Sequence, residues 1–165
     1  MKINRDQTDI MTAFFSELEK IGKRDKNVLF LTADHGAWAL AKFKKNLKNQ
    51  YMNFGISEQN MIGVASGLAR EGFKVFVTSF APFLSMRASE QVRMNLGYMR
   101  HNVNLIALGS GVTMGYLGNS HYGLEDLAIM RAIPGINISS PSDCGELKKV
   151  LHDLINKDRG PTYVR

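Results

Sequence analysis

Cysteine is almost absent from this sequence of 165 residues, and the one thiol, Cys144, has no partner for an internal disulfide. The chain also lacks a signal peptide and any apolar run long enough to cross a bilayer. We therefore expect a protein of a reducing, cytoplasmic setting with no membrane partner.

Low-complexity stretches, internal repeats and linkers are missing as well. Hydrophobic residues make up 44% of the chain and charged residues 22%, which is ordinary for a globular protein. A chain of this length buries a sizeable core without disulfides. We therefore expect one domain spanning residues 1–165.

Several familiar site motifs are missing too. The loop at 109–115 is rich in glycine, but its spacing and its late position do not fit a dinucleotide-binding fingerprint. No phosphate-binding Gly-Lys-Ser or Gly-Lys-Thr segment occurs. The sequence also signals no metal site, because the histidines are not closely spaced with one another or with the cysteine: His35, His101, His121 and His152.

The net charge of +6 comes partly from lysines at 42, 44, 45 and 48. They fit the wet side of a helix at 39–47. We favour a solvated helix face over a nucleic-acid site. Phosphate-bearing small molecules remain compatible with the charge.

Strand-like and helix-like segments alternate along the chain. The run at 28–33 is continuously apolar, which is typical of a strand covered on both faces. Further strands are expected near 51–54, 74–79, 103–108, 136–139 and 162–164, and helices near 7–22, 57–71, 83–100, 124–132 and after 143. This alternation predicts a three-layer, doubly wound α/β fold with a mostly parallel sheet and helices on both faces. Ligands of such sheets bind beyond the carboxyl ends of the strands.

Glu58 follows the expected strand at 51–54 and lies in the first turn of a helix for which Ser57 is the expected N-cap. A carboxylate there could simply favour the helix dipole. The following stretch, 61–68, is apolar and small, so the carboxylate could instead be poorly solvated and share a proton with a ligand nitrogen. Both interpretations remain open from the residues alone.

Aromatic residues follow the next expected strand. Phe80 and Phe83 could be core residues or a stacking wall for a flat heteroaromatic ring. His121 lies in a loop before a helix and could be exposed or could contact a substrate.

Together these segments resemble the central, pyrimidine-binding region of transketolases, from about residue 9 to residue 165. The resemblance rests on five ordered blocks: Thr32-Ala33-Asp34, 55–61, 80–92, 121–126, and Arg131-Ala132-Ile133-Pro134-Gly135 with Pro141-Ser142-Asp143. It implies an enzyme that uses thiamine diphosphate and transfers ketol groups between sugar phosphates.

The resemblance also implies roles for individual residues. Glu58 matches the glutamate that hydrogen-bonds the aminopyrimidine ring, favouring the imino tautomer that takes the proton from the thiazolium C2. Phe80 and Phe83 match the pyrimidine pocket, and His121 matches the histidine that contacts substrate hydroxyls. Asp34 resembles an aspartate near the cofactor rings. Met86 stands where an aromatic residue often completes the pocket, and its sulfur can still pack on a ring.

Two departures from the family pattern matter. Leu117 replaces an aspartate found in many transketolases, so deoxyxylulose-phosphate synthases and oxo-acid dehydrogenase beta subunits remain alternatives. The Gly-Asp-Gly segment and asparagine that ligate the family's metal are missing, as are the diphosphate-binding and C-terminal domains. We therefore expect a split subunit or a fragment, inactive alone, whose diphosphate-binding partner supplies Mg²⁺ or Ca²⁺. A homodimer is expected, and a non-catalytic homodimerising scaffold remains a further alternative.

Overall fold

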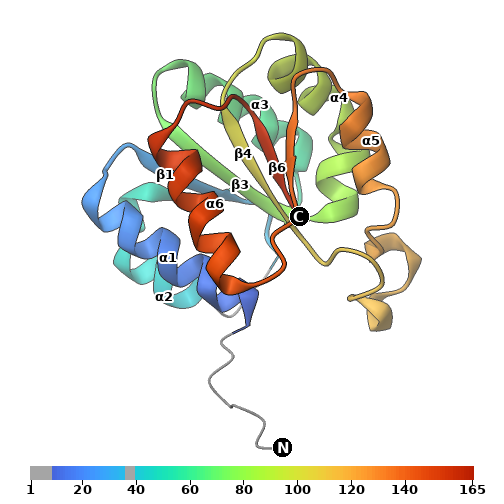
Figure 1. Cartoon of the computed structure of the whole chain (residues 1–165), viewed down its shortest axis with the longest axis horizontal. Coiled ribbons are helices and arrows are strands. Elements are labelled where there is room, and N and C mark those ends of the chain that lie inside the picture. Colours follow the sequence, from blue (N-terminus) through green and yellow to red (C-terminus); the bar gives the residue numbers. More distant parts are fainter. Residues whose placement is uncertain (1–8, 36–39) are drawn as a thin grey trace, which may run out of the picture.

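A computed structural model describes residues 9–35 and 40–165 and shows a six-stranded sheet (Figure 1). Its strands run in the order β2-β1-β3-β4-β6-β5, and every neighbouring pair is parallel. The strands are β1 (Val28–Thr32), β2 (Tyr51–Asn53), β3 (Lys74–Phe80), β4 (Val103–Leu108), β5 (Asn137–Ser139) and β6 (Thr162–Val164). The prediction of a parallel α/β sheet is confirmed.

Helices cover both faces of the sheet, as expected for a three-layer fold (Figure 1). One face carries α1 (Ile10–Arg24), α2 (Leu40–Asn46) and α6 (Cys144–Asn156), and the other carries α3 (Glu58–Arg70), α4 (Ser89–Gln91) and α5 (Asp126–Ala132). Side chains of β1 alternate between the two layers: Phe30 packs in the α1 layer, whereas Leu29 and Leu31 pack in the α3 layer. A buried strand can therefore be apolar throughout.

The first helix ends later than its glycine suggests. Gly22 is the boundary expected from the sequence, but α1 continues to Arg24. The helix begins at Ile10, and the start expected at residue 7 lies outside the described residues. A Cβ at Gly22 would come within 2.7 Å of Leu47 Cδ1. Close packing against the residue that follows α2, rather than helix termination, accounts for this glycine.

The helix expected at 83–100 is not a continuous α-helix. It consists of two π-helical segments, η2 (Phe83–Arg87) and η3 (Val92–Tyr98), on either side of the short α4. Such wide turns are rare and are frequently found at functional sites. Phe83 and Met86 therefore project from a π-helical segment, which hydrophobic periodicity alone does not reveal.

Ser57 occupies the N-cap position of α3, but its hydroxyl donates to the Phe54 carbonyl oxygen at 2.7 Å instead of accepting from the helix. Asp143 does cap α6, since its carboxylate accepts from the Glu146 amide at 2.8 Å. In residues 9–35 and 40–165, no helix combines the length and apolar character needed to cross a membrane.

Candidate functional site

Glu58 is the first residue of α3, and its carboxylate is buried at the carboxyl end of β3. Only 2% of the residue is exposed. Its Oε1 accepts a hydrogen bond from Ser79 Oγ at 3.1 Å, and its Oε2 accepts from Arg87 Nη1 at 3.0 Å. Of the two interpretations left open by the sequence, the structure favours the poorly solvated carboxylate, and the proton shared with a ligand nitrogen stays a prediction. Its two partners provide the hydrogen bonding that a buried charge requires.

Arg87 links the carboxylate to an aromatic surface. Its guanidinium carbon lies 3.8 Å from the centroid of the Phe83 ring, within cation–π range. One guanidinium thus contacts both Glu58 and Phe83, and both Arg87 and Phe83 belong to the π-helical segment η2. Sequence reasoning did not single out Arg87 or Ser79, because their partner lies more than twenty residues away along the chain.

Three rings predicted separately from the sequence meet beside this ion pair. Phe80 and Phe83 pack edge to face with centroids 5.8 Å apart. His121 packs edge to face on both, with its centroid 5.2 Å from Phe80 and 5.0 Å from Phe83. The structure therefore joins the aromatic pair, the histidine and, through Arg87, the buried Glu58.

His121 comes to this cluster on a loop that folds back to its own start. Gly111 and Gly123 exchange backbone hydrogen bonds of 2.8 and 2.9 Å, which close the base of the loop. Between them lie two short 3₁₀ turns, η4 (Gly115–Leu117) and η5 (Asn119–His121). The imidazole Nδ1 and Ser120 Oγ lie at hydrogen-bond distance, 3.0 Å apart.

Asp34 and Met86 lie outside this network of contacts. Asp34 has a φ of 52°, and its Oδ1 accepts from Asn53 Nδ2 at 3.0 Å while its amide donates to Asn53 Oδ1 at 3.1 Å. These bonds tie the end of β1 to the end of β2. Met86 is 41% exposed on η2. A cofactor role for either residue stays a prediction.

A cavity of about 550 Å³ opens beside Phe80, on the α1 side of the carboxyl ends of the strands. Its polar wall includes His35, Ser110, Ser140 and Arg165. The His35 ring lies 6.4 Å from the Phe80 ring, and its two buried nitrogens have no hydrogen-bond partner among the residues that the structure describes. Burial lowers the pKa of His35 from 6.5 to about 4, so the imidazole is neutral at pH 7.

This arrangement can hold a flat, nitrogen-bearing ring. A buried carboxyl group can share a proton with a nitrogen of such a ring, and the Phe80–Phe83 pair offers an aromatic wall. Across residues 9–35 and 40–165, no group of three or more His, Cys, Asp or Glu side chains is arranged to hold a metal ion.

The chain is similar to proteins of known families. Residues 6–165 match the family described as "Transketolase, pyrimidine binding domain". One of the subunits of an apulose-4-phosphate transketolase from Phocaeicola vulgatus is 37% identical over 154 residues, covering 93% of this chain and 49% of that protein. A 1-deoxy-D-xylulose-5-phosphate synthase of Corynebacterium glutamicum is 38% identical over 155 residues, covering 93% of this chain and 24% of that enzyme.

Among solved structures, a split gene transketolase described as an inactive beta4 tetramer superimposes with a TM-score of 0.83. It is 30% identical, and the match covers 96% of this chain and 51% of that one. The chain thus spans about half the length of the subunit-type relatives, and a quarter of the synthase.

Proposed function

Because the chain belongs to the family of transketolase pyrimidine-binding domains, we propose that it forms one half of a thiamine-diphosphate site. The observation that carries this proposal is the buried Glu58 beside the Phe80–Phe83 pair. The other half comes from a diphosphate-binding domain or subunit. The activity is ketol transfer between sugar phosphates, carried out only when both halves are present.

In this proposal each residue of the site has a physical task. Thiamine diphosphate, when bound, supplies the carbanion chemistry. Glu58 shares a proton with the pyrimidine nitrogen, and Ser79 and Arg87 keep its two carboxylate oxygens in place. Phe80 and Phe83 exclude water from the ring, which strengthens the hydrogen bond at Glu58. His121 contacts hydroxyls of the substrate.

The partner completes what this chain does not offer. We propose that it supplies Mg²⁺ or Ca²⁺ together with the diphosphate-binding residues, in a cytoplasmic enzyme. We also propose that two copies of this chain meet through an apolar face of α3 and η3. The exposed large apolar side chains of α3, η3 and the residue that follows η3 are Val64, Met94, Tyr98 and Met99. A Cβ added to Gly63 or Gly67 of α3 would have no neighbouring atom within 4 Å, so a second backbone can approach closely there.

A second reaction remains a candidate because of Leu117. This residue lies in η4 of the loop that carries His121, and it replaces an aspartate at a position that would face the sugar. A relative that is 38% identical is a 1-deoxy-D-xylulose-5-phosphate synthase. Assaying the reconstituted complex with ketose phosphates and, separately, with pyruvate distinguishes the two reactions.

The test of the proposal is Glu58→Ala in the complex with a partner that carries a Gly-Asp-Gly segment. We expect ketol transfer to be abolished while the circular dichroism spectrum stays unchanged. Glu90→Ala, which removes an exposed carboxylate on α4, is the matched control and should retain activity. Activity retained in Glu58→Ala would refute the mechanism. Calorimetry that detects no thiamine diphosphate binding to the chain, with or without the partner, would favour a non-catalytic scaffold.

A further inference from the structure

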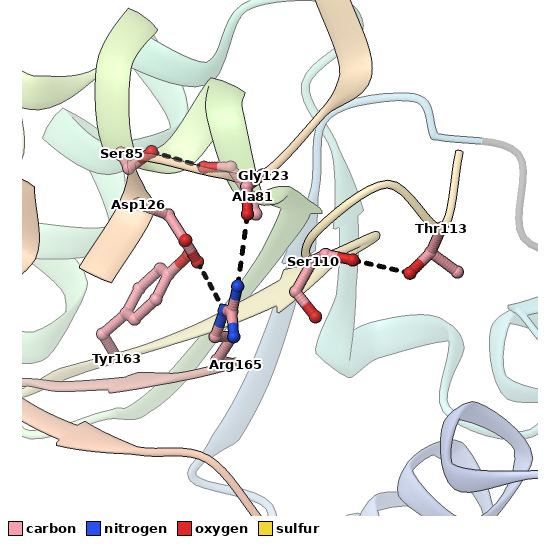
Figure 2. Close-up of polar contacts among 8 residues, drawn as sticks. All are labelled: Ala81, Ser85, Ser110, Thr113, Gly123, Asp126, Tyr163 and Arg165. Carbon is pink, nitrogen blue, oxygen red and sulfur yellow. Dashed lines mark hydrogen bonds and ion pairs between the residues drawn. The ribbon is translucent and has the colours of Figure 1, made fainter. Parts of the chain in front are cut away.

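Asp126 is a buried charge to which the proposed cofactor site gives no task. It is the first residue of α5, five positions after His121, and its exposed fraction is 0%. Its Oδ2 accepts from Tyr163 Oη at 2.7 Å and from Arg165 Nε at 3.0 Å, so both donors come from the end of β6 and the residue after it (Figure 2). Its Oδ1 is buried and has no hydrogen-bond partner in the described part of the chain.

Arg165 also binds Gly123, three residues before Asp126 in the same segment. Its Nη2 donates to the Gly123 carbonyl oxygen at 3.2 Å, beside the bond from its Nε to Asp126 (Figure 2). One planar guanidinium therefore fixes two residues, 123 and 126, where the chain leaves the loop and enters α5. A fork of fixed geometry restrains orientation as well as distance.

Gly123 also packs closely against Ala81 and Ser110. A Cβ at this residue would lie 2.8 Å from the Ala81 Cβ and 3.2 Å from Ser110 Cα. Ala81 is itself held, because Ser85 Oγ donates to its carbonyl oxygen at 2.7 Å, and Thr113 Oγ1 donates to the Ser110 carbonyl oxygen at 2.5 Å (Figure 2). Contacts thus run without a break from β6 to the loop base, two residues from His121.

Stability alone is a weak reason for such an arrangement. A buried ion pair is often no more stabilising than apolar residues of the same volume, because both ions lose their hydration. Burial, followed by the hydrogen bond to Asp126, raises the pKa of Tyr163 above its usual range, so the phenol stays a donor. The Asp126–Arg165 pair instead fixes the position of residues 123–126, at the end of the loop.

We propose that Asp126 and Arg165 are positioning residues, which hold the base of the loop at 111–123 so that His121 stays packed on Phe80 and Phe83. Neither residue needs to touch substrate for this purpose. The effect on His121 follows from the contacts alone, whereas its consequence for ketol transfer rests on the proposed function.

The test measures the position of His121 directly, without a partner. The imidazole protons lie beside two phenyl rings, so their NMR resonances carry ring-current shifts, and His121→Gln assigns them by their loss. We expect Asp126→Asn and Arg165→Gln to move these resonances toward random-coil values. Asp153→Asn and Arg159→Gln break an exposed ion pair of the same residue types and are the matched controls, which should leave them unchanged.

Each outcome supports or overturns the positioning role. Unchanged His121 resonances in folded Asp126→Asn and Arg165→Gln would overturn the proposal. If Asp126→Asn fails to fold, Arg165→Gln decides alone, since Arg165 is 23% exposed in its side chain. Tyr163→Phe keeps the ion pair and should leave His121 in place, and an equal displacement there would assign the effect to general packing and overturn the proposal.

In the complex with the partner, the two variants should lower kcat/KM by about 10- to 100-fold, the cost of misplacing a group by an ångström or so. The KM for the sugar phosphate should change with the same variants that move the His121 resonances. A wild-type complex without ketol transfer would defeat the proposed function and leave the resonance measurement intact.

Discussion

Replacing His35 with phenylalanine tests whether a neutral, buried imidazole shapes the acid stability of the fold. Within 9–35 and 40–165, neither buried ring nitrogen of His35 has a hydrogen-bond partner, and burial lowers its pKa from 6.5 to about 4. Phenylalanine has a similar shape and no polar atoms to leave unsatisfied. At pH 7.5 we therefore expect His35→Phe to be as stable as the wild type or more stable.

The pH dependence follows from proton binding in the two states. The folded pKa of about 4 lies below the ordinary value of 6.5, so between these values the unfolded chain binds more protons. The stability that the neutral imidazole contributes is complete above about pH 6.5 and is lost as the pH falls toward 4. With 1.36 kcal/mol for each pKa unit, the loss approaches about 3 kcal/mol.

Urea titrations of both proteins at several pH values between 7.5 and 4.5 measure this difference. The carboxylates with lowered pKa, such as Asp9, Glu17 and Asp25, lose stability in both proteins and cancel in the comparison. The advantage of His35→Phe should therefore widen as the pH falls. Phe14→Leu, which alters the wall of the same cavity without changing a titrating group, should differ from the wild type by a constant amount. If the difference in free energy of unfolding between His35→Phe and the wild type does not change with pH, the reasoning is refuted.

Two further predictions concern the carboxylate and the apolar face. Arg87→Met leaves the buried Glu58 without its cation and should lower the free energy of unfolding by about 1–3 kcal/mol, measured by urea titration. The same change should weaken thiamine diphosphate binding to the complex in calorimetry, and unchanged affinity would argue against a role for the pair. Val64→Lys should shift the chain from dimer to monomer in analytical ultracentrifugation, whereas Val112→Lys, at another exposed valine, should not. If Val64→Lys and Val112→Lys show the same proportions of dimer and monomer, the proposed dimer face is wrong.

Most of the fold could be predicted from the sequence, because apolar runs and their spacing report burial directly. The strand expected at 162–164 matches β6, and the carboxylate predicted in the first turn of a helix is the first residue of α3. The π-helical segments were missed because an apolar residue fits an α-turn and a π-turn equally well. The boundary at Gly22 was wrong because packing against Leu47, not chain termination, requires the glycine.

The site could be predicted only in part, for a related reason. Glu58, the two phenylalanines and His121 follow strand ends, and the carboxyl ends of parallel strands share one edge of the sheet. Arg87 and Arg165 were missed because their partners lie 29 and 39 residues away in sequence. Pairing over such distances depends on strand order, and no local pattern records it.

The strand order has a consequence for how the molecule is made. β6 lies between β4 and β5, and β5 pairs with no other strand among the described residues. During synthesis, β5 leaves the ribosome more than twenty residues before β6, the strand with which it pairs. Until β6 is made, the backbone groups of β5 form hydrogen bonds with water. The sheet is therefore completed only when β6 inserts between β4 and β5. Because non-local strand pairing is slow, we expect this insertion to limit the rate of folding.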